Sequence, residues 1–384
     1  MTAGESRLFD KLSLGNFKAF ATADIPLGRF TLLSGLNSSG KSTVLQAIAL
    51  MRQAAESSDR DPWDLDGVPL NGELIELGTG QDVLYEDYAR RRGTGPEIEF
   101  LLVGRTTGTF GFTLSYGAGD DYLRVIRTRK ELLPGDRASD FPLFSPGFQY
   151  LHADRISPAA TYPRSERMSV RRRFLGTRGE YAIDFLRANL DELVNPGPMR
   201  RDDVSPRLLD QVQAWMGEIC PGVRIETAVV EHTDLVRLGF QFTTARKPVS
   251  RTRRPTNVGF GLTYALPIVV ACLTAQPGSM ILLENPEAHV HPQGQTAMAR
   301  LTCAAAASGA QVIVETHSDH VLNGVRLSVK GGVLSAGEVV LNYFAREDDG
   351  IHIISPAVGP DGMLSEWPPG FFDEWDRSLD ELLE

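Results

Sequence analysis

The chain has 384 residues, of which 42% are hydrophobic, and a formal net charge of −10 at pH 7. This length accommodates two or three domains of ordinary size, or one large α/β domain with insertions. The negative net charge excludes a uniformly basic surface for nucleic acid, but it leaves room for local basic patches. Three widely spaced cysteines without C-x-x-C spacing predict reduced thiols, not a disulfide framework or a zinc site.

The N-terminal residues contain no basic stretch followed by an apolar one, so we expect no signal peptide. The most apolar stretch, Phe260 to Ala275, is short for a membrane span and contains Pro267. A buried helix explains this stretch better than a membrane helix does. We therefore expect a cytoplasmic protein that has no membrane partner.

The most informative stretch lies between Leu8 and Thr43, where we predict two strands followed by a phosphate loop. Gly35 to Thr43 reads GLNSSGKST and fits the pattern G-x-x-x-x-G-K-[ST]. An apolar run precedes the motif and a helix-like run follows it, which is the strand–loop–helix context that a P-loop requires. Its glycines allow successive N–H groups to surround a phosphate at a helix N-terminus. The alternative is a Gly/Ser turn before an ordinary helix.

Three cations and one hydroxyl near this loop are candidate nucleotide ligands. Lys41 is predicted to reach the β- and γ-phosphates of a bound triphosphate, and Ser42 is predicted to bind Mg²⁺. Lys18 and Arg29 stand just upstream of the loop. Each of these two cations could touch a nucleotide, and a solvated surface charge is the alternative for both.

The block from residue 95 to residue 255 is expected to be an insertion with a strand-rich part and a helical part. Turn signals alternate with runs typical of antiparallel strands at 98–103, 109–115 and 122–128. The other predicted elements are a strand at 148–153, helices at 181–194 and 207–219, and a hairpin of strands at 224–230 and 235–243. Arg155 follows the strand at 148–153, where it could serve a phosphate or a buried carboxylate.

Two arginine-rich segments stand out in this acidic chain. The segment from Arg164 to Arg178 contains six arginines. The second segment carries five cations, namely Arg246, Lys247, Arg251, Arg253 and Arg254. Segregated positive charge of this kind predicts contact with a DNA backbone or an acidic partner, and solvated loops are the alternative.

Two short apolar runs further along the chain, at 280–283 and 311–315, predict buried parallel strands. Glu284 and Glu287 follow the first strand, and His317 follows the second. The carboxyl ends of parallel strands are where a P-loop protein holds Mg²⁺. We therefore expect Glu284 and His317 to lie at the same edge of a sheet.

The remaining signals are weaker. A glycine-rich turn from Asn257 to Pro267 precedes an apolar run and predicts a second helix N-terminus that could face a phosphate. His289 and His291 have H-x-H spacing, which could bind a metal but more often caps a helix or packs. The last predicted elements are helices at 293–307 and from 319 to 327, a hairpin at 339–345 and 351–355, and an acidic amphipathic helix at 371–384.

Together these motifs resemble the ABC-type ATPase head shared by SMC, RecF-like and OLD-family proteins. More closely they resemble the stand-alone bacterial AAA-type (ABC-like) ATPases encoded beside phage-defence genes. The resemblance covers Leu8 to about Val83, Tyr150 to Asp154, and Asn257 to the end of the sequence. It is carried by the motifs N-F-K-A-F, G-L-N-S-S-G-K-S-T, E-N-P-E-A-H-V-H-P and E-T-H-S-D-H.

The resemblance implies an α/β fold: an ABC-type P-loop NTPase head with a mixed central sheet, an antiparallel β part and an inserted α/β middle region. The head would be split, with its N-terminal half at 1–94 and its C-terminal half at 256–384. It also implies ATP and Mg²⁺ as cofactors. A signature segment that contacts the ATP of a second subunit implies an ATP-sandwich homodimer.

The resemblance also implies roles for individual residues. Glu284 stands at the Walker B carboxylate, His317 at the switch histidine, and Gln81 at a glutamine that senses Mg²⁺. The triphosphate would be bound by Lys18 and by Asn37, Ser38, Ser39, Gly40, Lys41, Ser42 and Thr43. The Mg²⁺ ligands would be Ser42, Glu284 and Gln81. The signature segment would act through Asn257, Gly259, Gly261 and Thr263. The catalytic group would comprise Lys41, Glu284, Asn285, Glu287 and His317.

One departure from the ABC pattern concerns Asn285, which stands where such heads usually carry a glutamate that polarises the attacking water. Asparagine orients water but cannot accept its proton, so Glu287 or Glu284 compensates or hydrolysis is slow. A Toprim nuclease domain, as in OLD proteins, is not expected after His317. We therefore predict an ATP-dependent dimeric switch that regulates or loads a separately encoded effector, such as a nuclease, in a defence or DNA-transaction system. The alternative is a nucleotide-gated DNA-binding or scaffold module with little or no turnover.

Overall fold

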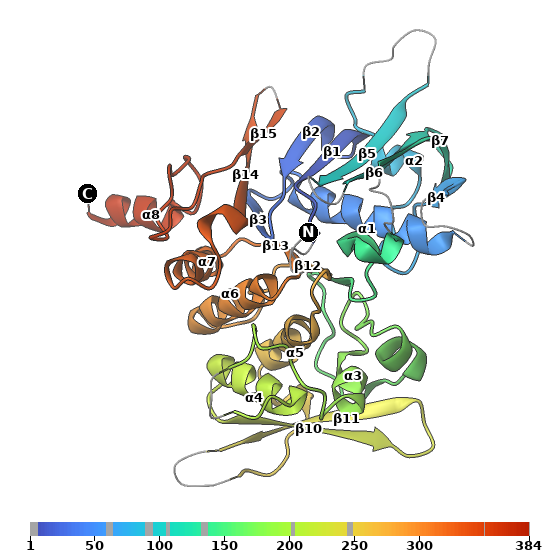
Figure 1. The fold of residues 1–384 in the computed structure, drawn as a ribbon. Coiled ribbons are helices and arrows are strands. Elements are labelled where there is room, and N and C mark those ends of the chain that lie inside the picture. The colour runs from blue at the N-terminus through green and yellow to red at the C-terminus, as the bar shows by residue number, and fades with distance from the viewer. Residues whose placement is uncertain are drawn as a thin grey trace. The chain divides into compact units, whose positions relative to one another are not determined.

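The computed structural model describes residues 7–58, 64–88, 95–104, 108–131, 137–200, 204–243, 249–348 and 350–383. The chain forms two compact units. Figure 1 shows their helices and strands, coloured along the sequence. Unit 1 comprises Met1–Ser145, Gly337–Val358 and Leu364–Glu384, and unit 2 comprises Pro146–Ala336 and Gly359–Met363. The division into parts at 1–94, 95–255 and 256–384 stays a prediction.

An antiparallel sheet forms the larger part of unit 1. Its strands lie in the order β2-β1-β5-β6-β7-β4. Their bounds are Phe20–Pro26, Lys11–Phe17, Glu97–Gly104, Gly108–Ser115, Tyr122–Glu131 and Gly67–Pro69. The antiparallel pairing of β5, β6 and β7 confirms the three strands predicted there.

The segment before the phosphate loop holds three strands, where two were predicted. The first two form a hairpin in which Phe17 pairs with Phe20. Lys18, at φ 47°, supplies the left-handed turn residue between them. A turn made without glycine or proline gave no break in the sequence pattern, which is why the prediction undercounted. The third strand, β3 (Phe30–Gly35), leads directly into the loop.

The rest of unit 1 surrounds β3. Strand β14 (Val339–Glu347) pairs with it in parallel and with β15 (Gly350–Ile354) in antiparallel, which confirms the predicted final hairpin. The helices of this unit are α1 (Lys41–Ser57), the one-turn α2 (Gly80–Val83) and α8 (Glu374–Leu383). Helix α8 begins three residues later than predicted because Phe371 is buried, with its ring 5.3 Å from that of Tyr343.

Unit 2 contains a parallel arrangement of three strands in the order β13-β12-β8. Their bounds are Gln311–Glu315, Met280–Glu284 and Gln149–Leu151. All three were predicted, and their almost complete burial explains the continuous apolar runs in the sequence. Parallel strands begin and end together, so β12 and β13 deliver the segments that follow them to the same edge.

Helices and a second, smaller sheet complete unit 2. The helices are α3 (Ala182–Ala188), α4 (Leu208–Ile219), α5 (Phe260–Thr274), α6 (Pro292–Ala307) and α7 (Asp319–Lys330). The small sheet has the order β10-β11-β9, with bounds Val223–Val230, Leu235–Phe242 and Tyr162–Pro163. Helix α5 is buried from Leu262 to Leu273 except at Tyr264, as the sequence predicted. In the ranges that the structure describes, no helix has the length and apolarity needed to cross a bilayer.

Candidate functional site

The phosphate loop of unit 1 joins β3 to the N-terminus of α1. Ser38 and Gly40 have φ values of 60° and 93°, and left-handed residues of this kind turn backbone N–H groups toward a common centre. The ammonium of Lys41 is buried and donates to the carbonyl oxygens of Gly35 at 3.0 Å and Leu36 at 2.6 Å. Asn37 lies exposed at the tip of the loop. The loop therefore has the form that the motif predicts.

The two glycines of the motif are required by their surroundings. A Cβ on Gly35 would lie 2.5 Å from the carbonyl oxygen of Phe344, and one on Gly40 would lie 2.6 Å from the ring of Phe20. Both residues also have positive φ, which other residues rarely adopt. Strands β2 and β14 thus pack against the loop and restrict its backbone conformation.

The other candidate nucleotide contacts in unit 1 are already engaged or lie on the surface. Lys18 donates to the side-chain oxygen of Gln46 on α1 at 2.7 Å, and burial lowers the pKa of its ammonium. Arg29 forms an ion pair with Glu338 at 2.7 Å, so it is a salt-bridged residue here. Gln81 is exposed on α2, and its role as a Mg²⁺ ligand stays a prediction.

In unit 2, Glu284, the predicted Walker B carboxylate, accepts a hydrogen bond at each of its two oxygens. Glu284 ends β12, and its two oxygens accept from the hydroxyl of Tyr150 and, at 3.1 Å, from the backbone N–H of Ala153. Burial and the nearby Glu284 raise the pKa of Tyr150 well above its usual range, so the phenol keeps the proton that it donates. Glu315 lies opposite Glu284 in the parallel register of β12 and β13 and is 5% exposed.

Arg155 serves neither a phosphate nor a carboxylate, the two roles considered from the sequence. Its guanidinium is 1% exposed and donates to four backbone carbonyls. Those of Glu284 and Asn285 accept at 2.7 Å, that of His152 at 3.0 Å and that of Tyr264 at 3.1 Å. Burial lowers the pKa of Arg155 to about 10, which leaves it protonated at neutral pH. Arg155 thereby ties β8, the end of β12 and helix α5 together.

The turn after β12 and the loop after β13 contact each other. Glu287 accepts from the backbone N–H of His317 at 2.9 Å through Oε1, while its buried Oε2 has no hydrogen-bond partner. Asn285 has φ 43° and donates from its backbone to the carbonyl oxygen of Glu315 at 2.8 Å. Its buried Oδ1 likewise lacks a partner. Unit 2 therefore brings together Glu284, Asn285, Glu287 and His317, and their catalytic role stays a prediction.

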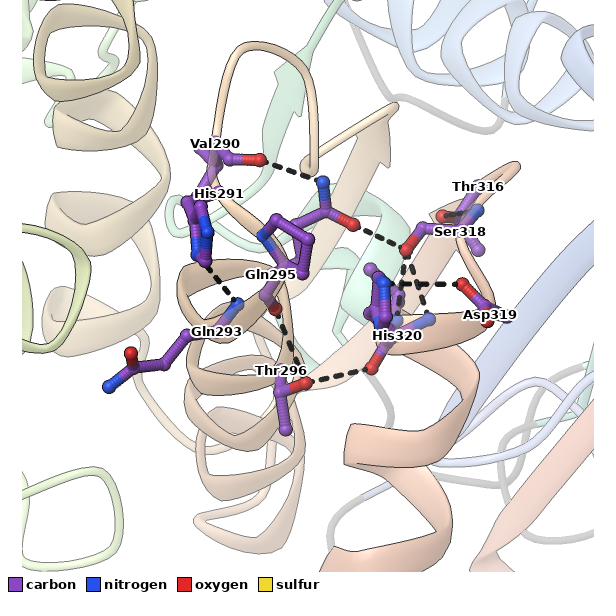
Figure 2. A network of polar contacts seen from close by, with 11 residues as sticks. Val290, His291, Gln293, Gln295, Thr296, Thr316, Ser318, Asp319 and His320 are labelled. Carbon is purple, nitrogen blue, oxygen red and sulfur yellow. Dashed lines mark hydrogen bonds and ion pairs between the residues drawn. The ribbon is translucent and has the colours of Figure 1, made fainter.

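A polar network extends from this turn into α6 and α7 (Figure 2). The side-chain amide of Gln295 donates to the carbonyl oxygen of Val290 at 2.7 Å and accepts from the hydroxyl of Ser318 at 2.6 Å. Ser318 is also the N-cap of α7 and accepts from the backbone N–H groups of His320 and Val321. The two segments that follow β12 and β13 are thus joined through a side chain of α6.

The H-x-H pair has the packing and capping roles that were the alternative to metal binding. His289 lies 4.7 Å from Tyr264 and 5.7 Å from Phe260, ring centre to ring centre. His291 is the N-cap of α6, with Nδ1 accepting from the backbone N–H of Gln293 at 3.4 Å. Among the residues described, no three His, Cys, Asp or Glu side chains are grouped so that they could hold a metal ion.

The signature-like segment forms the start of α5. Asn257 and Gly259 are exposed ahead of the helix, and Thr263 is buried in its first turns. A Cβ on Gly261 would lie 2.5 Å from the carbonyl oxygen of His289, so only glycine lets the turn after β12 approach α5 this closely. The role of these residues in a second subunit's site stays a prediction.

The arginine-rich segments are partly used within the fold. Arg173 pairs with Glu192 at 2.7 Å, and Arg178 pairs with Asp154 at 3.3 Å. Arg164 and Arg167 are exposed. In the second segment Arg251, Arg253 and Arg254 are exposed, while Arg246 and Lys247 lie outside the described residues. These exposed cations leave the predicted contact with DNA or an acidic partner as a proposal.

Four residues of unit 2 were missed or misjudged from sequence. Tyr150 acts on Glu284, which is far away in the chain, and Gln295 joins Val290 to Ser318, so no local pattern indicated either residue. Arg155 was noticed, but its backbone partners were not foreseen. Glu315 did carry a signal, because it is a carboxylate at the end of a buried strand, as Glu284 is.

Comparison with known proteins agrees with this geometry. Residues 145–323 match the family described as "AAA domain, putative AbiEii toxin, Type IV TA system", and residues 334–382 match "Protein of unknown function (DUF3696)". A structure of an SMC head bound to the C-terminal winged-helix domain of ScpA is similar over 91% of this chain and 98% of its own, with 15% identity and a TM-score of 0.51. An SMC head with an extended coiled coil, bound to the C-terminal domain of ScpA and derived from Pyrococcus furiosus, is similar over 98% of this chain and 99% of its own, with 14% identity and a TM-score of 0.50. No curated protein sequence matches the chain.

The chain therefore has the mixed α/β fold of an ABC-type P-loop ATPase head, as predicted. Within it, residues 145–323 match the AAA-domain family model, and the chain is similar in fold to SMC heads. The resemblance to SMC heads that was drawn from the sequence motifs is thus confirmed at the level of the fold.

Proposed function

We propose that this protein binds ATP with Mg²⁺, hydrolyses it slowly, and acts as a dimeric switch for a separately encoded effector. The observation that carries the proposal is the presence, in one chain, of an ordered phosphate loop and of the cluster formed by Glu284, Asn285, Glu287 and His317. In this proposal Lys41 and the loop N–H groups bind the phosphates. Ser42, Glu284 and Gln81 would hold Mg²⁺, which would neutralise phosphate charge.

Glu287 is the residue that we assign to accept the proton of the attacking water. Both oxygens of Glu284 already accept hydrogen bonds, whereas Glu287 keeps one oxygen without a donor. Asn285 would orient the water through its own unpaired oxygen. The water oxygen would then bond to the γ-phosphorus, ADP would leave, and the proton would pass to Glu287. His317, whose backbone is bonded to Glu287, would sense the γ-phosphate.

The dimer and its partners belong to the same proposal. Asn257, Gly259, Gly261 and Thr263 would complete the ATP site of a second copy, so that ATP joins two heads and hydrolysis releases them. The SMC heads of similar fold were solved with a domain of ScpA bound, which supports partner binding as a use of this fold. The family description naming a putative AbiEii toxin supports a role in defence. The effector would then be a co-encoded cytoplasmic protein, such as a nuclease.

A second candidate function is a nucleotide-gated DNA-binding or scaffold module with little turnover. Asn285 in place of the usual glutamate favours it, as do the exposed arginines near residues 164 and 251. Calorimetric titration with ATP, with and without Mg²⁺, tests nucleotide binding directly. Steady-state hydrolysis with and without duplex DNA then separates the two candidates, because only the switch requires turnover.

Replacing Glu287 by Gln is expected to lower kcat about 10²-fold, the lower end of the range for a general base. The amide retains the shape of the side chain and can still accept from the N–H of His317, so ATP affinity should change little. Phosphate release at saturating ATP measures kcat, and calorimetry measures affinity. Wild-type turnover of tens per second that is unaffected by Glu287→Gln would count against the assignment.

Replacing Tyr150 by Phe is expected to lower kcat about tenfold, since hydrogen bonds to charged groups are worth ~1.5–3 kcal/mol. The change removes only the hydroxyl that orients Glu284 and leaves the N–H of Ala153 as its remaining donor. Tyr343→Phe is the matched control, because it removes a buried tyrosine hydroxyl that bonds to the carbonyl oxygen of Pro369. Equal rates for the two variants would refute a role for Tyr150 in orienting Glu284.

A further inference from the structure

Three connections, made by four hydrogen bonds, join the turn after β12 to the end of β13 and the loop that follows it. The backbone N–H of Asn285 donates to Glu315, and the carboxylate of Glu287 accepts from the N–H of His317. The third tie runs through Gln295, which contacts the carbonyl oxygen of Val290 and the hydroxyl of Ser318 (Figure 2). We call this pair of side-chain hydrogen bonds the Gln295 bridge. Of these three connections, the Gln295 bridge is the one made by a residue outside both segments.

The chemistry of its partners leaves the bridge one orientation. A backbone carbonyl can only accept, so the amide nitrogen of Gln295 must face Val290. The hydroxyl of Ser318 already accepts from the N–H groups of His320 at 3.1 Å and Val321 at 3.2 Å, so its proton is available to Gln295. Only a side chain with both a donor and an acceptor at this length satisfies the two ends. Neither glutamate nor alanine can do so at neutral pH.

The turn between Asn285 and Val290 depends on such outside support. Asn285 and His289 adopt left-handed φ values of 43° and 62°, so the turn cannot be part of a regular helix. Two backbone hydrogen bonds close the turn on itself, from the N–H of Ala288 to Asn285 at 3.1 Å and from the N–H of Val290 to Glu287 at 3.0 Å. The carbonyl of Val290 and the N-cap Ser318 are the points at which the bridge holds the turn to the His317 loop.

We propose that Gln295 is a positioning residue that holds the turn after β12 and the His317 loop as one unit, and so keeps the Glu287 carboxylate beside His317 for ATP hydrolysis. This inference rests on the proposed function of the same site. Gln295 does not contact nucleotide; it acts through Val290 and Ser318. Its loss removes one of the three connections and loosens the placement of Glu287 beside His317, which lowers kcat without changing the phosphate loop that binds ATP.

The first test compares Gln295→Ala with Gln293→Ala in the full-length chain. Gln293 is the matched control, because it lies two residues earlier on α6, is exposed, and points away from the network (Figure 2). Loss of the two hydrogen bonds predicts a roughly tenfold lower kcat for Gln295→Ala, with KM for ATP unchanged. Gln293→Ala should match the wild type. Equal kcat values for the two variants, or a change in KM as large as that in kcat, would overturn the inference.

A second variant, Gln295→Glu, should show a pH dependence of kcat that a loss of side-chain packing would not produce. In Gln295→Glu, the ionised carboxylate can accept from Ser318 but has no proton for the carbonyl of Val290. Protonating that carboxyl restores the donor, so kcat relative to wild type should rise as the pH falls from about 7.5 to about 5. A ratio that stays flat over this range would argue against the bridge. Ser318→Ala combined with Gln295→Ala should cost less than the sum of the two single changes.

A measurement without ATP separates failure of this inference from failure of the proposed function. Histidine labelled with ¹⁵N gives seven backbone amide signals, one of which reports the His317 N–H that Glu287 accepts. That signal should shift in nucleotide-free Gln295→Ala and not in Gln293→Ala. An unmoved signal refutes the positioning role even in an active enzyme. A shifted signal in a protein that takes up no ATP refutes the proposed function alone.

Discussion

Replacing Lys41 by Ala should weaken ATP binding by about 2–5 kcal/mol, the usual cost of truncating one partner of a buried, hydrogen-bonded charge pair. That corresponds to a roughly 30-fold to several-thousand-fold rise in Kd. The buried ammonium donates hydrogen bonds to the carbonyl oxygens of Gly35 and Leu36, in the loop where phosphate oxygens would bind. Without it, a triphosphate would meet backbone dipoles alone. Calorimetric titration with Mg²⁺–ATP measures the change.

Lys330→Ala is the control for this comparison, since Lys330 is an exposed lysine at the end of α7. Its Kd should equal that of the wild type. Circular dichroism of Lys41→Ala should retain the native helix content, which shows that lost affinity is not lost folding. A Kd for Lys41→Ala within twofold of the wild type would remove the phosphate loop from the proposed ATP site.

Replacing Arg155 by Met should destabilise the protein by about 3–5 kcal/mol, because breaking a buried charged network leaves its partners unpaired. Four backbone carbonyls, those of His152, Tyr264, Glu284 and Asn285, would each lose the donor that the buried guanidinium supplies. Arg155→Lys should be nearly as harmful, since an ammonium cannot span the positions that the planar guanidinium reaches. Chemical denaturation of both variants measures the loss.

Arg178→Met provides the comparison, because Arg178 is a half-exposed arginine paired with Asp154. Exposed ion pairs contribute about 0–1 kcal/mol, so this variant should unfold close to the wild-type midpoint. If Arg155→Met also unfolded there, the four carbonyls would have found other donors. The proposed tie between β8, β12 and α5 would then be unnecessary for stability.

The phosphate loop and the buried strands could be predicted because their determinants are local. A few neighbouring residues are enough to predict each of these elements. The motif G-x-x-x-x-G-K-[ST] predicts the phosphate loop, and the apolar runs before Glu284 and Thr316 predict buried strands. The hairpin at Lys18 escaped prediction because its left-handed turn residue is a lysine. Helix α8 was extended too far because the amphipathic pattern continues through Phe371, which is in fact a core residue.

The supporting side chains could not be predicted, for a physical reason. Tyr150 and Glu284 are 134 positions apart, and Arg155 and Asn285 are 130 apart. Such pairs depend on which strands become neighbours, and a single sequence does not state this. The predicted convergence of Lys41 with Glu284 and His317 on one nucleotide has the same character and stays a prediction. The Gln295 bridge likewise became visible only once α6 was placed against the two loops.

The backbone at Asn285 accounts for its own amino acid. A φ of 43° is tolerated by asparagine better than by longer side chains, because its short amide can bond locally to the main chain. A glutamate introduced at this position would therefore have to overcome conformational strain before it could contribute any chemistry. The backbone conformation of the turn thus limits which side chains position 285 can carry.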